Sequence, residues 1–417
     1  MNFSENQYKR RLEELYRISP SVQTAGFAPD AYKPGLEGMR ELDSASGRPS
    51  SRLRFIHVAG TNGKGSVCSM FAAALSAAGM KTGLYTSPHL LDFRERMKIC
   101  TADGWKMISR EEVWEYLDSF QNAIAGRSFF EVTTGMALWW FDREGVDIAV
   151  METGLGGRLD STNIITPELS VITSIGLDHC KLLGSTRAEI AAEKAGIFKA
   201  GTPALVWGHD SETDKIFERK AEDMPCPLFF ADEMGIASAS ENADLKAECQ
   251  AVNRRTVLAG LELLGIATDS GTLDHAAALT GLRGRWETLS TNPEVICDIG
   301  HNPSALEPNF KKLRGTGRPL IIVYGVMADK DYRSNISLIP DGATVIAASP
   351  DTPRALDTET LAGEISNLRS DLSVILSESV ADAVGIALKK ATENSESIIF
   401  ICGSTFVVSE AIQYIEK

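Results

Sequence analysis

Residues 57–67 read HVAGTNGKGSV, and this stretch decides the fold class. It begins inside a short apolar run at residues 54–60 and ends where an Ala-rich segment at residues 67–78 begins. The order strand, glycine loop, helix is typical of a phosphate site, because glycines let successive N–H groups face an anion at the positive end of the helix. We therefore expect an α/β domain built around a phosphate-binding loop.

The lysine and serine of this loop suit a nucleotide. Lys64 can reach the outer phosphates, and Ser66 can offer its hydroxyl to the metal ion that accompanies them. The strict P-loop pattern has Ser or Thr directly after the lysine, whereas Gly65 intervenes here, so the loop is a variant. A glycine-rich turn can also join a strand to a helix without binding anything. The strand–loop–helix setting around the lysine favours the phosphate site.

Short apolar runs alternate with helical patterns along the rest of the chain, which implies a parallel sheet covered on both faces. The sequence predicts further strands at 82–86, 146–152, 169–175 and 203–207, and helices at 6–19, 110–125, 188–198, 242–264 and 273–280. After residue 286 the pattern restarts, with strands at 295–299, 320–324, 343–348 and 397–402 and a closing helix to residue 415. This second series has the size of one domain. We place the boundary near Leu289, which gives domains 1–288 and 289–417.

Charge and cysteine content narrow the classes of function. The 417 residues carry a formal net charge of -14, so nucleic acid and membrane surfaces are not expected as partners. Seven scattered cysteines without a CxxC pair argue against a disulfide framework or a zinc site and fit a reducing compartment. The first residues lack the apolar core of a signal peptide. We expect a soluble cytoplasmic protein.

A second glycine loop follows an acidic residue that ends a predicted strand. Glu152 closes the run 146–152, and residues 153–160 read TGLGGRLD. Ligands of open parallel sheets gather at the carboxyl ends of strands, so this carboxylate is well placed to hold Mg²⁺. An acid that closes a strand is more often a solvated or capping group. The neighbouring phosphate loop reverses that preference here.

Seven motifs together go beyond pattern counting. They are GTNGKGS at 60–66, YTSPHL at 85–90, METGLGGRLDSTN at 151–163, SIGLDH at 174–179, AAEKAGIF at 191–198, GRWE at 284–287 and DIGHNP at 298–303. In sequence and in order they resemble the folylpolyglutamate synthase/dihydrofolate synthase family, which belongs to the Mur-type ATP-dependent amide ligases. The resemblance runs from about Tyr32 to the end of the chain. It implies a P-loop parallel-sheet domain of the Mur ligase central-domain type, followed by a smaller Rossmann-like α/β C-terminal domain that acts in glutamate ligation.

The resemblance also implies roles for individual residues. The nucleotide would be bound by Thr61, Asn62, Gly63, Lys64, Gly65, Ser66, Asn253, Arg285, Asp298 and His301. Magnesium would be bound by Ser87, Glu152, His179 and Lys194, with Lys194 carbamylated, and Lys64, Lys194 and His179 would be the catalytic residues. The folate acid would be bound by Ser128, Phe129, Phe130, Glu131, Leu159, Asp160 and Ser161. A phenylalanine pair is more often core than a stacking surface, so only the family context supports that part of the site.

The implied activity is ligation of an acid to an amino acid. A carboxylate of dihydropteroate, or the γ-carboxylate of a reduced folate, would attack ATP to give an acyl phosphate, and the amino group of L-glutamate would then displace phosphate. ATP is the co-substrate, two Mg²⁺ sites are expected, and a monovalent cation requirement stays open. We expect a monomer with small-molecule substrates only.

Two other readings remain open at the level of sequence. A Mur ligase of peptidoglycan precursors would need an additional N-terminal domain for its large nucleotide-linked substrate, and the residues before His57 are too few for one. An ATP-gated binding switch is compatible with the phosphate loop alone, but it has no use for a second magnesium site.

Overall fold

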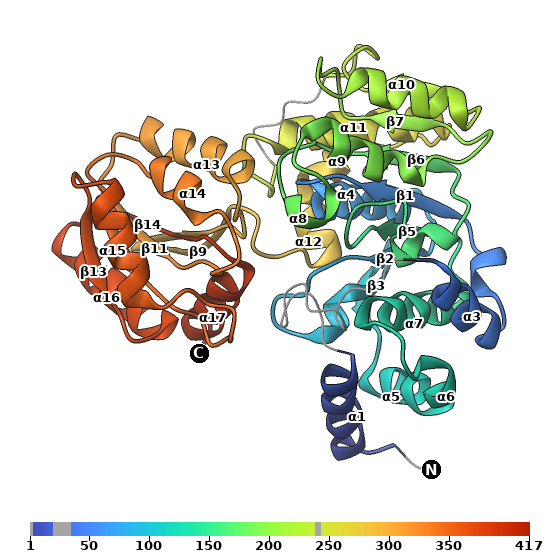
Figure 1. Ribbon diagram of the computed structural model, residues 1–417, viewed down its shortest axis with the longest axis horizontal. Helices are drawn as coiled ribbons and strands as arrows, with labels where there is room; N and C mark the ends of the chain where they lie inside the picture. Colours follow the sequence, from blue (N-terminus) through green and yellow to red (C-terminus); the bar gives the residue numbers. More distant parts are fainter. Residues whose placement is uncertain (1–2, 20–34, 238–242) are drawn as a thin grey trace. The chain divides into compact units, whose positions relative to one another are not determined.

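The computed structural model describes residues 3–19, 35–237 and 243–417, which fold into two compact units (Figure 1). The first unit contains the described residues up to Asp244 together with Gln250–Leu282. The second contains Leu245–Cys249 and Arg283–Lys417. Within the described residues, no helix is both long enough and apolar enough to cross a membrane.

An eight-stranded sheet organises the first unit, in the order β4-β3-β2-β5-β1-β6-β7-β8. The strands are β1 (Phe55–Ala59), β2 (Thr82–Tyr85), β3 (Met97–Thr101), β4 (Gly104–Met107), β5 (Ile148–Glu152), β6 (Leu169–Ile172), β7 (Ala204–Val206) and β8 (Leu228–Phe230). Six neighbouring strands of this sheet pair in parallel: β2, β5, β1, β6, β7 and β8. The strands β3 and β4 add an antiparallel edge beside β2. The central strand β1 is fully buried, as a strand covered on both faces must be.

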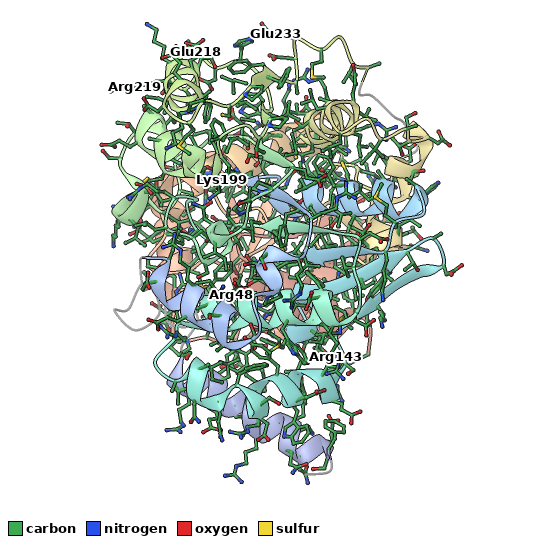
Figure 2. All side chains as sticks on the ribbon, turned by 90° about the vertical axis from the view of Figure 1, so that its right-hand side faces the viewer. Arg48, Arg143, Lys199, Glu218, Arg219 and Glu233 are labelled. Carbon is green, nitrogen blue, oxygen red and sulfur yellow. The ribbon has the colours of Figure 1, made fainter. Side chains whose placement is uncertain are left out.

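Helices cover both faces of this sheet, and side chains fill the space between the layers (Figure 2). On one face lie α4 (Lys64–Ala77), α11 (Gln250–Leu263) and α12 (Ala276–Thr280), and on the other α1 (Glu5–Ile18), α3 (Glu37–Ala45), α5 (Arg110–Ser119), α6 (Gln121–Ile124), α7 (Phe129–Arg143), α9 (Arg187–Lys194) and α10 (Asp214–Asp223). Short elements complete the unit: α8 (Cys180–Leu183) and the 3₁₀ turns η1 (Pro49–Ser51), η2 (Phe93–Arg96), η3 (Ser161–Ile164), η4 (Ala195–Ile197) and η5 (Ser270–His275). The helix α4 is buried almost all round, which makes it the centre of the first face.

The second unit is a six-stranded sheet in the order β13-β12-β11-β14-β10-β9 (Figure 1, orange to red). The strands are β9 (Glu287–Thr291), β10 (Glu294–Cys297), β11 (Leu320–Tyr324), β12 (Thr344–Ala347), β13 (Ser373–Leu376) and β14 (Ile398–Cys402). The helices α13 (Pro303–Gly315), α14 (Tyr332–Ser337) and α15 (Thr358–Leu368) pack on one face, and α16 (Val380–Glu393) and α17 (Thr405–Ile415) on the other. The strands are parallel except for β9, which is antiparallel to β10.

The chain crosses between the units three times. Residues Leu245–Cys249, which we call the strap, leave the first unit, join the second and return at Gln250. Ala247 is buried in the same apolar cluster as Trp286 and Phe310 of the second unit. Lys312 Nζ donates to the carbonyl oxygen of Lys246, so the strap is held by packing and by a hydrogen bond.

The predicted α/β fold class is confirmed, with three differences in detail. The sheets are mixed, because β3, β4 and β9 form antiparallel edges that alternation of short runs cannot reveal. The helix predicted from residue 242 begins at Gln250; residue 242 lies outside the described residues, as does Tyr32, and residues 243–249 are not helical. The predicted boundary at 288/289 falls inside β9, which pairs with β10, whereas the units divide between Leu282 and Arg283.

Candidate active site

The phosphate loop connects β1 to α4, as the sequence predicts. Gly63 caps α4 with φ of 86°, a left-handed conformation that favours glycine. Gly60 has φ of 152° and lies so close to Thr173 that a Cβ atom would be 1.7 Å from its Oγ1. These two glycines let the loop curl at the positive end of a 14-residue helix.

Hydrogen bonds join this loop to the segment that follows β6. Thr61 N donates to the carbonyl oxygen of Ser174 at 2.7 Å, and Gly176 N donates to Thr61 Oγ1 at 3.0 Å. Thr173 Oγ1 donates to the carbonyl oxygen of Asn62 at 2.7 Å. The loop is therefore fixed against the segment that leads to His179.

Two lysines converge on one carbonyl oxygen of the loop. Lys64 Nζ lies 3.1 Å from Gly60 O and 3.2 Å from Thr61 O, and Lys194 Nζ reaches Gly60 O at 2.7 Å from the end of α9. Lys194 is buried, and burial, together with the positive charge of Lys64, lowers its pKa to about 7. Asp178 and Asp160 act in the opposite direction. The site thus concentrates positive charge where an anion would be bound.

Ser87 and Glu152 meet beside the phosphate loop. The register pairs Tyr85 of β2 with Met151 of β5, so the two strands end together, and Ser87 N donates to Glu152 Oε2 at 3.0 Å. Glu152 is 3 % exposed. Since β2, β5, β1 and β6 are consecutive in the sheet, Ser87, Glu152, the phosphate loop and the segment before His179 follow the carboxyl ends of four neighbouring strands.

His179 has φ of 54° and stands just before the short helix α8. Its Nε2 lies 3.8 Å from Asp178 Oδ2. Among the described residues, no three His, Cys, Asp or Glu side chains gather as a metal cluster. The donors at this edge still fit a hard divalent cation, because they include a buried carboxylate and a hydroxyl. As an ammonium, Lys194 would repel that cation, so it fits only if it carries an acidic group.

The helix α11 supplies a contact that the sequence analysis missed. Asn253, predicted to bind nucleotide, lies against the phosphate loop, where a Cβ on Gly63 would be 2.5 Å from its Oδ1. Its Nδ2 donates to Gln250 Oε1 at 2.8 Å, and Gln250 Nε2 donates to Ser66 Oγ at 3.2 Å. A glutamine in the first turn of a predicted helix carries no local signal of such a role.

The residues predicted to bind folate form two structural motifs. Ser128 and Glu131 are a capping box at the start of α7: Ser128 N and Oγ both donate to Glu131 Oε2 at 2.8 Å, and Glu131 N donates to Ser128 Oγ at 3.2 Å. Phe129 is buried against Tyr16, with ring centroids 5.5 Å apart. Phe130 is half-buried and touches Gly154, where a Cβ would be 2.4 Å from its ring. Of these side chains, Phe130 is the one that borders the second glycine loop.

Asp160 holds the second glycine loop from inside, between half-buried Leu159 and buried Ser161. Its Oδ2 accepts from Gly154 N at 2.9 Å and from Leu155 N at 2.8 Å, and its Oδ1 accepts from Thr162 N and Oγ1. Burial raises the pKa of Asp160, and these hydrogen bonds oppose the rise. Its carboxylate thus fixes the loop backbone that follows Glu152.

A buried histidine ends this chain of bonds. His57 Nε2 lies 2.8 Å from Thr162 Oγ1. The hydroxyl of Thr162 donates to the carboxylate of Asp160, so His57 Nε2 must be the donor to Thr162. Burial lowers the pKa of His57 to about 3, which keeps the ring neutral.

The predicted nucleotide residues beyond position 283 all lie in the second unit. Asp298 is buried after β10, accepts from Trp286 N and Gly300 N at 2.8 Å each, and has its pKa raised mainly by burial. Arg285 Nη1 donates to Gly284 O at 3.3 Å, and the Arg285 charge lowers the pKa of Asp298. His301 Nδ1 lies 3.1 Å from Ile299 O. These three residues surround the end of β10.

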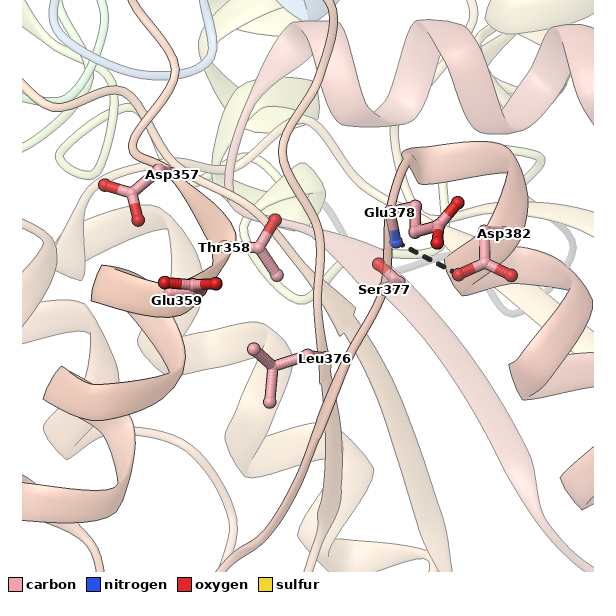
Figure 3. Close-up of a pocket in the computed structure, with 7 residues that line it drawn as sticks. All are labelled: Asp357, Thr358, Glu359, Leu376, Ser377, Glu378 and Asp382. Carbon is pink, nitrogen blue, oxygen red and sulfur yellow. Dashed lines mark hydrogen bonds between the residues drawn. The ribbon is translucent and has the colours of Figure 1, made fainter.

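A separate hollow in the second unit lies between the starts of α15 and α16 and has no predicted site residue in its lining (Figure 3). Four of its seven lining residues are acidic. Asp357 caps α15 through Thr360 N, and Asp382 accepts from Glu378 N at 3.1 Å, so two of these carboxylates already bond backbone amides. The acidic lining therefore does not suit an anionic ligand.

Comparison with known proteins follows this division of the chain. Residues 58–263 match the Mur ligase middle domain, and residues 284–405 match the Mur ligase glutamate ligase domain. The dihydrofolate synthase/folylpolyglutamate synthase of Escherichia coli is 32% identical over 86% of this chain and 86% of its own length, and that of Bacillus subtilis is 31% identical over 91% and 94%. The chain belongs to the folylpolyglutamate synthase/dihydrofolate synthase family.

Solved structures of this family have the same fold. Folylpolyglutamate synthase of Mycobacterium tuberculosis with ADP aligns with a TM-score of 0.85 at 26% identity, covering 99% of both chains. Escherichia coli FolC with DHPP and ADP aligns with a TM-score of 0.82 at 27% identity, covering 98% of this chain and 97% of that chain. The chain spans about half, 48%, of a probable bifunctional folylpolyglutamate synthase/dihydropteroate synthase of Haloferax volcanii, to which it is 34% identical.

Proposed function

We propose that this family member is an ATP-dependent ligase that adds L-glutamate to dihydropteroate, to the γ-carboxylate of reduced folates, or to both. The observation that carries the proposal is the shared edge of β2, β5, β1 and β6, where a phosphate loop meets a buried Glu152 and a buried Lys194. The names of the relatives, which include dihydrofolate synthase and folylpolyglutamate synthase, support the choice of acceptor.

The reaction has two steps. A carboxylate oxygen of the folate acid attacks the γ-phosphorus of ATP, the bond to the β,γ-bridging oxygen breaks, and ADP leaves. The amine nitrogen of L-glutamate then attacks the acyl carbon, loses a proton, and expels inorganic phosphate to leave an amide. Because an anion attacks an anion in the first step, positive charge must converge on the phosphates.

Residues of this chain supply much of that charge. Lys64 and the helix start of α4 would hold the phosphates. Ser87, Glu152, His179 and Lys194 would hold Mg²⁺. Bound Mg²⁺ would neutralise phosphate charge and polarise phosphoryl oxygens. We infer two such sites.

Lys194 fits this set as a carbamate. Its neutral amine would add to CO₂ with loss of a proton, which turns a cation into an anion beside the metal ligands. The lowered pKa, about 7, leaves a large neutral fraction of the amine near pH 7, and only the neutral amine is nucleophilic. Mass spectrometry of the native protein under CO₂ would detect an added carboxyl group on Lys194.

Product analysis tests the function directly. The protein is incubated with ATP, L-glutamate and either dihydropteroate or a reduced folate, and products are identified by mass. We expect a gain of one glutamate, and phosphate release that depends on both the acid and glutamate. Release that ignores glutamate would favour an ATP-gated switch, and activity only with a nucleotide-linked peptidoglycan precursor would favour a Mur ligase.

The proposal includes a monomer that acts in the reducing cytoplasm. The seven cysteines are free thiols in the structure, which suits that compartment. Light scattering during turnover, with a mass other than 45.1 kDa for the active species, would overturn the monomer.

A further inference from the structure

A chain of three buried polar side chains connects α11 to the phosphate loop. Asn253 Nδ2 donates to Gln250 Oε1 at 2.8 Å, and Gln250 Nε2 donates to Ser66 Oγ at 3.2 Å. Gln250 and Asn253 are each 6 % exposed and Ser66 is 1 % exposed. Polar groups buried to this degree are costly unless they are bonded, so the three residues hold one another in place.

The direction of these bonds determines what Ser66 can do. The side-chain oxygen of Gln250, Oε1, accepts the hydrogen bond from Asn253. The side-chain nitrogen, Nε2, must therefore face Ser66. Ser66 Oγ therefore accepts this bond with one lone pair. Its second lone pair and its own proton can then take only the directions that Gln250 leaves, which restricts rotation of the hydroxyl about the Cβ–Oγ bond.

We propose that Gln250 is a positioning residue for the phosphate loop, which holds the Ser66 hydroxyl so that a lone pair faces the divalent cation of the Mg²⁺–nucleotide complex. The inference rests on the proposed function, since it assigns Ser66 a metal-bound nucleotide. Residues that orient a metal ligand commonly contribute 10–100-fold to metal affinity or activity.

Gln250 lies where the chain returns from the strap to the first unit. It is the first residue of α11, and Cys249 before it belongs to the strap and hence to the second unit. The bond to Ser66 therefore starts at a point where the chain crosses between the units.

A double-mutant cycle tests the proposal with Mg²⁺–ADP as the probe. The variants are Gln250→Leu, Ser66→Ala and the pair, and binding is measured by calorimetry with Mg²⁺ and with EDTA. We expect Gln250→Leu to weaken binding of Mg²⁺–ADP about tenfold and that of metal-free ADP about twofold or less. In the Ser66→Ala background Gln250→Leu should have no further effect. Equal effects of Gln250→Leu in both backgrounds, or no effect in either, would overturn the proposal.

Two further variants separate positioning from simple packing. Thr256→Val is the matched control, because Thr256 is buried on the same helix and its hydroxyl donates to Val252 O, within α11, at 2.9 Å. This variant should leave Mg²⁺–ADP binding unchanged. Gln250→Glu keeps the side-chain length and loses the donor while it is ionised. Its Mg²⁺–ADP affinity should recover as the pH falls and the protonated acid donates again, and a flat pH profile would contradict the role of the donor.

Turnover distinguishes this inference from the proposed function. If the wild-type protein adds no glutamate to any folate acid but the cycle is non-additive, the function fails and the role of Gln250 stands. If glutamate is added and the cycle is additive, the role of Gln250 fails alone.

Discussion

The carboxyl edges of the two sheets use buried charge differently. In the first unit, Glu152, Asp160 and Lys194 are all buried near the ends of parallel strands. In the second unit, Asp298 is the one charged side chain that is buried among the described residues. Buried charges cost free energy unless they are well paired. The first edge therefore gives up stability that the second edge retains.

What those charges contact shows why. Asp298 accepts hydrogen bonds from two backbone N–H groups, so its charge supports the loop that contains His301. Asp160 supports the second glycine loop of the first unit in the same way. Lys64 and Lys194 instead donate to the same carbonyl oxygen of Gly60. Two ammonium groups at one oxygen repel each other, and an anion would relieve that repulsion. The difference indicates that the first edge is arranged for a ligand and the end of β10 in large part for its own backbone.

Replacement of Lys64 should give the largest effect. Lys64→Ala is expected to lower folate-dependent phosphate release about a thousandfold, because we propose that the side chain holds the phosphates. The free energy of unfolding should change by less than about 1 kcal/mol, since Lys64 is only half-buried and Gly60 O also accepts a hydrogen bond from Lys194. Lys106→Ala, which removes a surface lysine paired with Glu144, is the control for loss of charge. Retained activity would remove the loop from the mechanism.

Replacement of Lys194 tests the proposed carbamate. Lys194→Ala should lose about a hundredfold in activity, and added acetate should restore part of it by standing in for the carbamate. Lys199→Ala is a matched control: Lys199, labelled in Figure 2, is also partly buried with a lowered pKa and donates to Asn163 O at 3.0 Å. An unmodified, fully active amine at Lys194 in native mass spectra would contradict the prediction.

A pair of isosteric variants compares the two edges directly. Asp298→Asn should destabilise the protein by about 1–3 kcal/mol, because the amide NH₂ cannot accept and leaves a buried backbone N–H unpaired. Glu152→Gln can keep the hydrogen bond from Ser87 N, so the free energy of unfolding should change by less than about 1 kcal/mol. Loss of the carboxylate charge should lower activity at least about tenfold. Chemical denaturation measures the change in stability of each variant, and phosphate release measures the change in activity. A large loss of stability in Glu152→Gln with little change in Asp298→Asn would contradict the contrast between the two edges.

A surface histidine that follows β7 gives the smallest effect. His209 lies 2.9 Å from Asp214 and 2.9 Å from Glu233, which is labelled in Figure 2, and these partners raise its pKa to about 9. A raised pKa means that the stabilisation is complete below the unfolded value near 6.5 and is lost as the pH rises through 9. Because His209 is exposed, we expect less than about 1 kcal/mol. Thermal unfolding of His209→Asn should lack this loss between pH 6 and 10.

Much of the fold follows from local sequence, and the reasons are physical. Residues 57–67 predicted the strand, the loop and the helix start, because glycine conformation and helix polarity are local properties. Antiparallel edges and the strap escaped prediction because they depend on partners distant in sequence. The boundary of α11 was misplaced for the same reason.

The site was predictable to a smaller degree. Glu152 could be placed at a strand end from its pattern, and the sequence S-x-x-E at 128–131 carries the signature of the capping box that the structure contains. Gln250 could not be found, since its importance arises only when α11 packs on α4. The binding roles predicted for the folate, metal and nucleotide residues stay predictions until ligands are bound.

The strap also determines whether a single proteolytic cut can separate the two units. A single cut between Leu282 and Arg283 would leave residues 245–249 docked on the far fragment, so the two pieces should co-elute and come apart only in denaturant. A recombinant second half that starts at Arg283 would lack Ala247 and expose the apolar surface beside Trp286. Dissection of this protein into halves therefore needs the five-residue strap supplied in trans or grafted onto the second half.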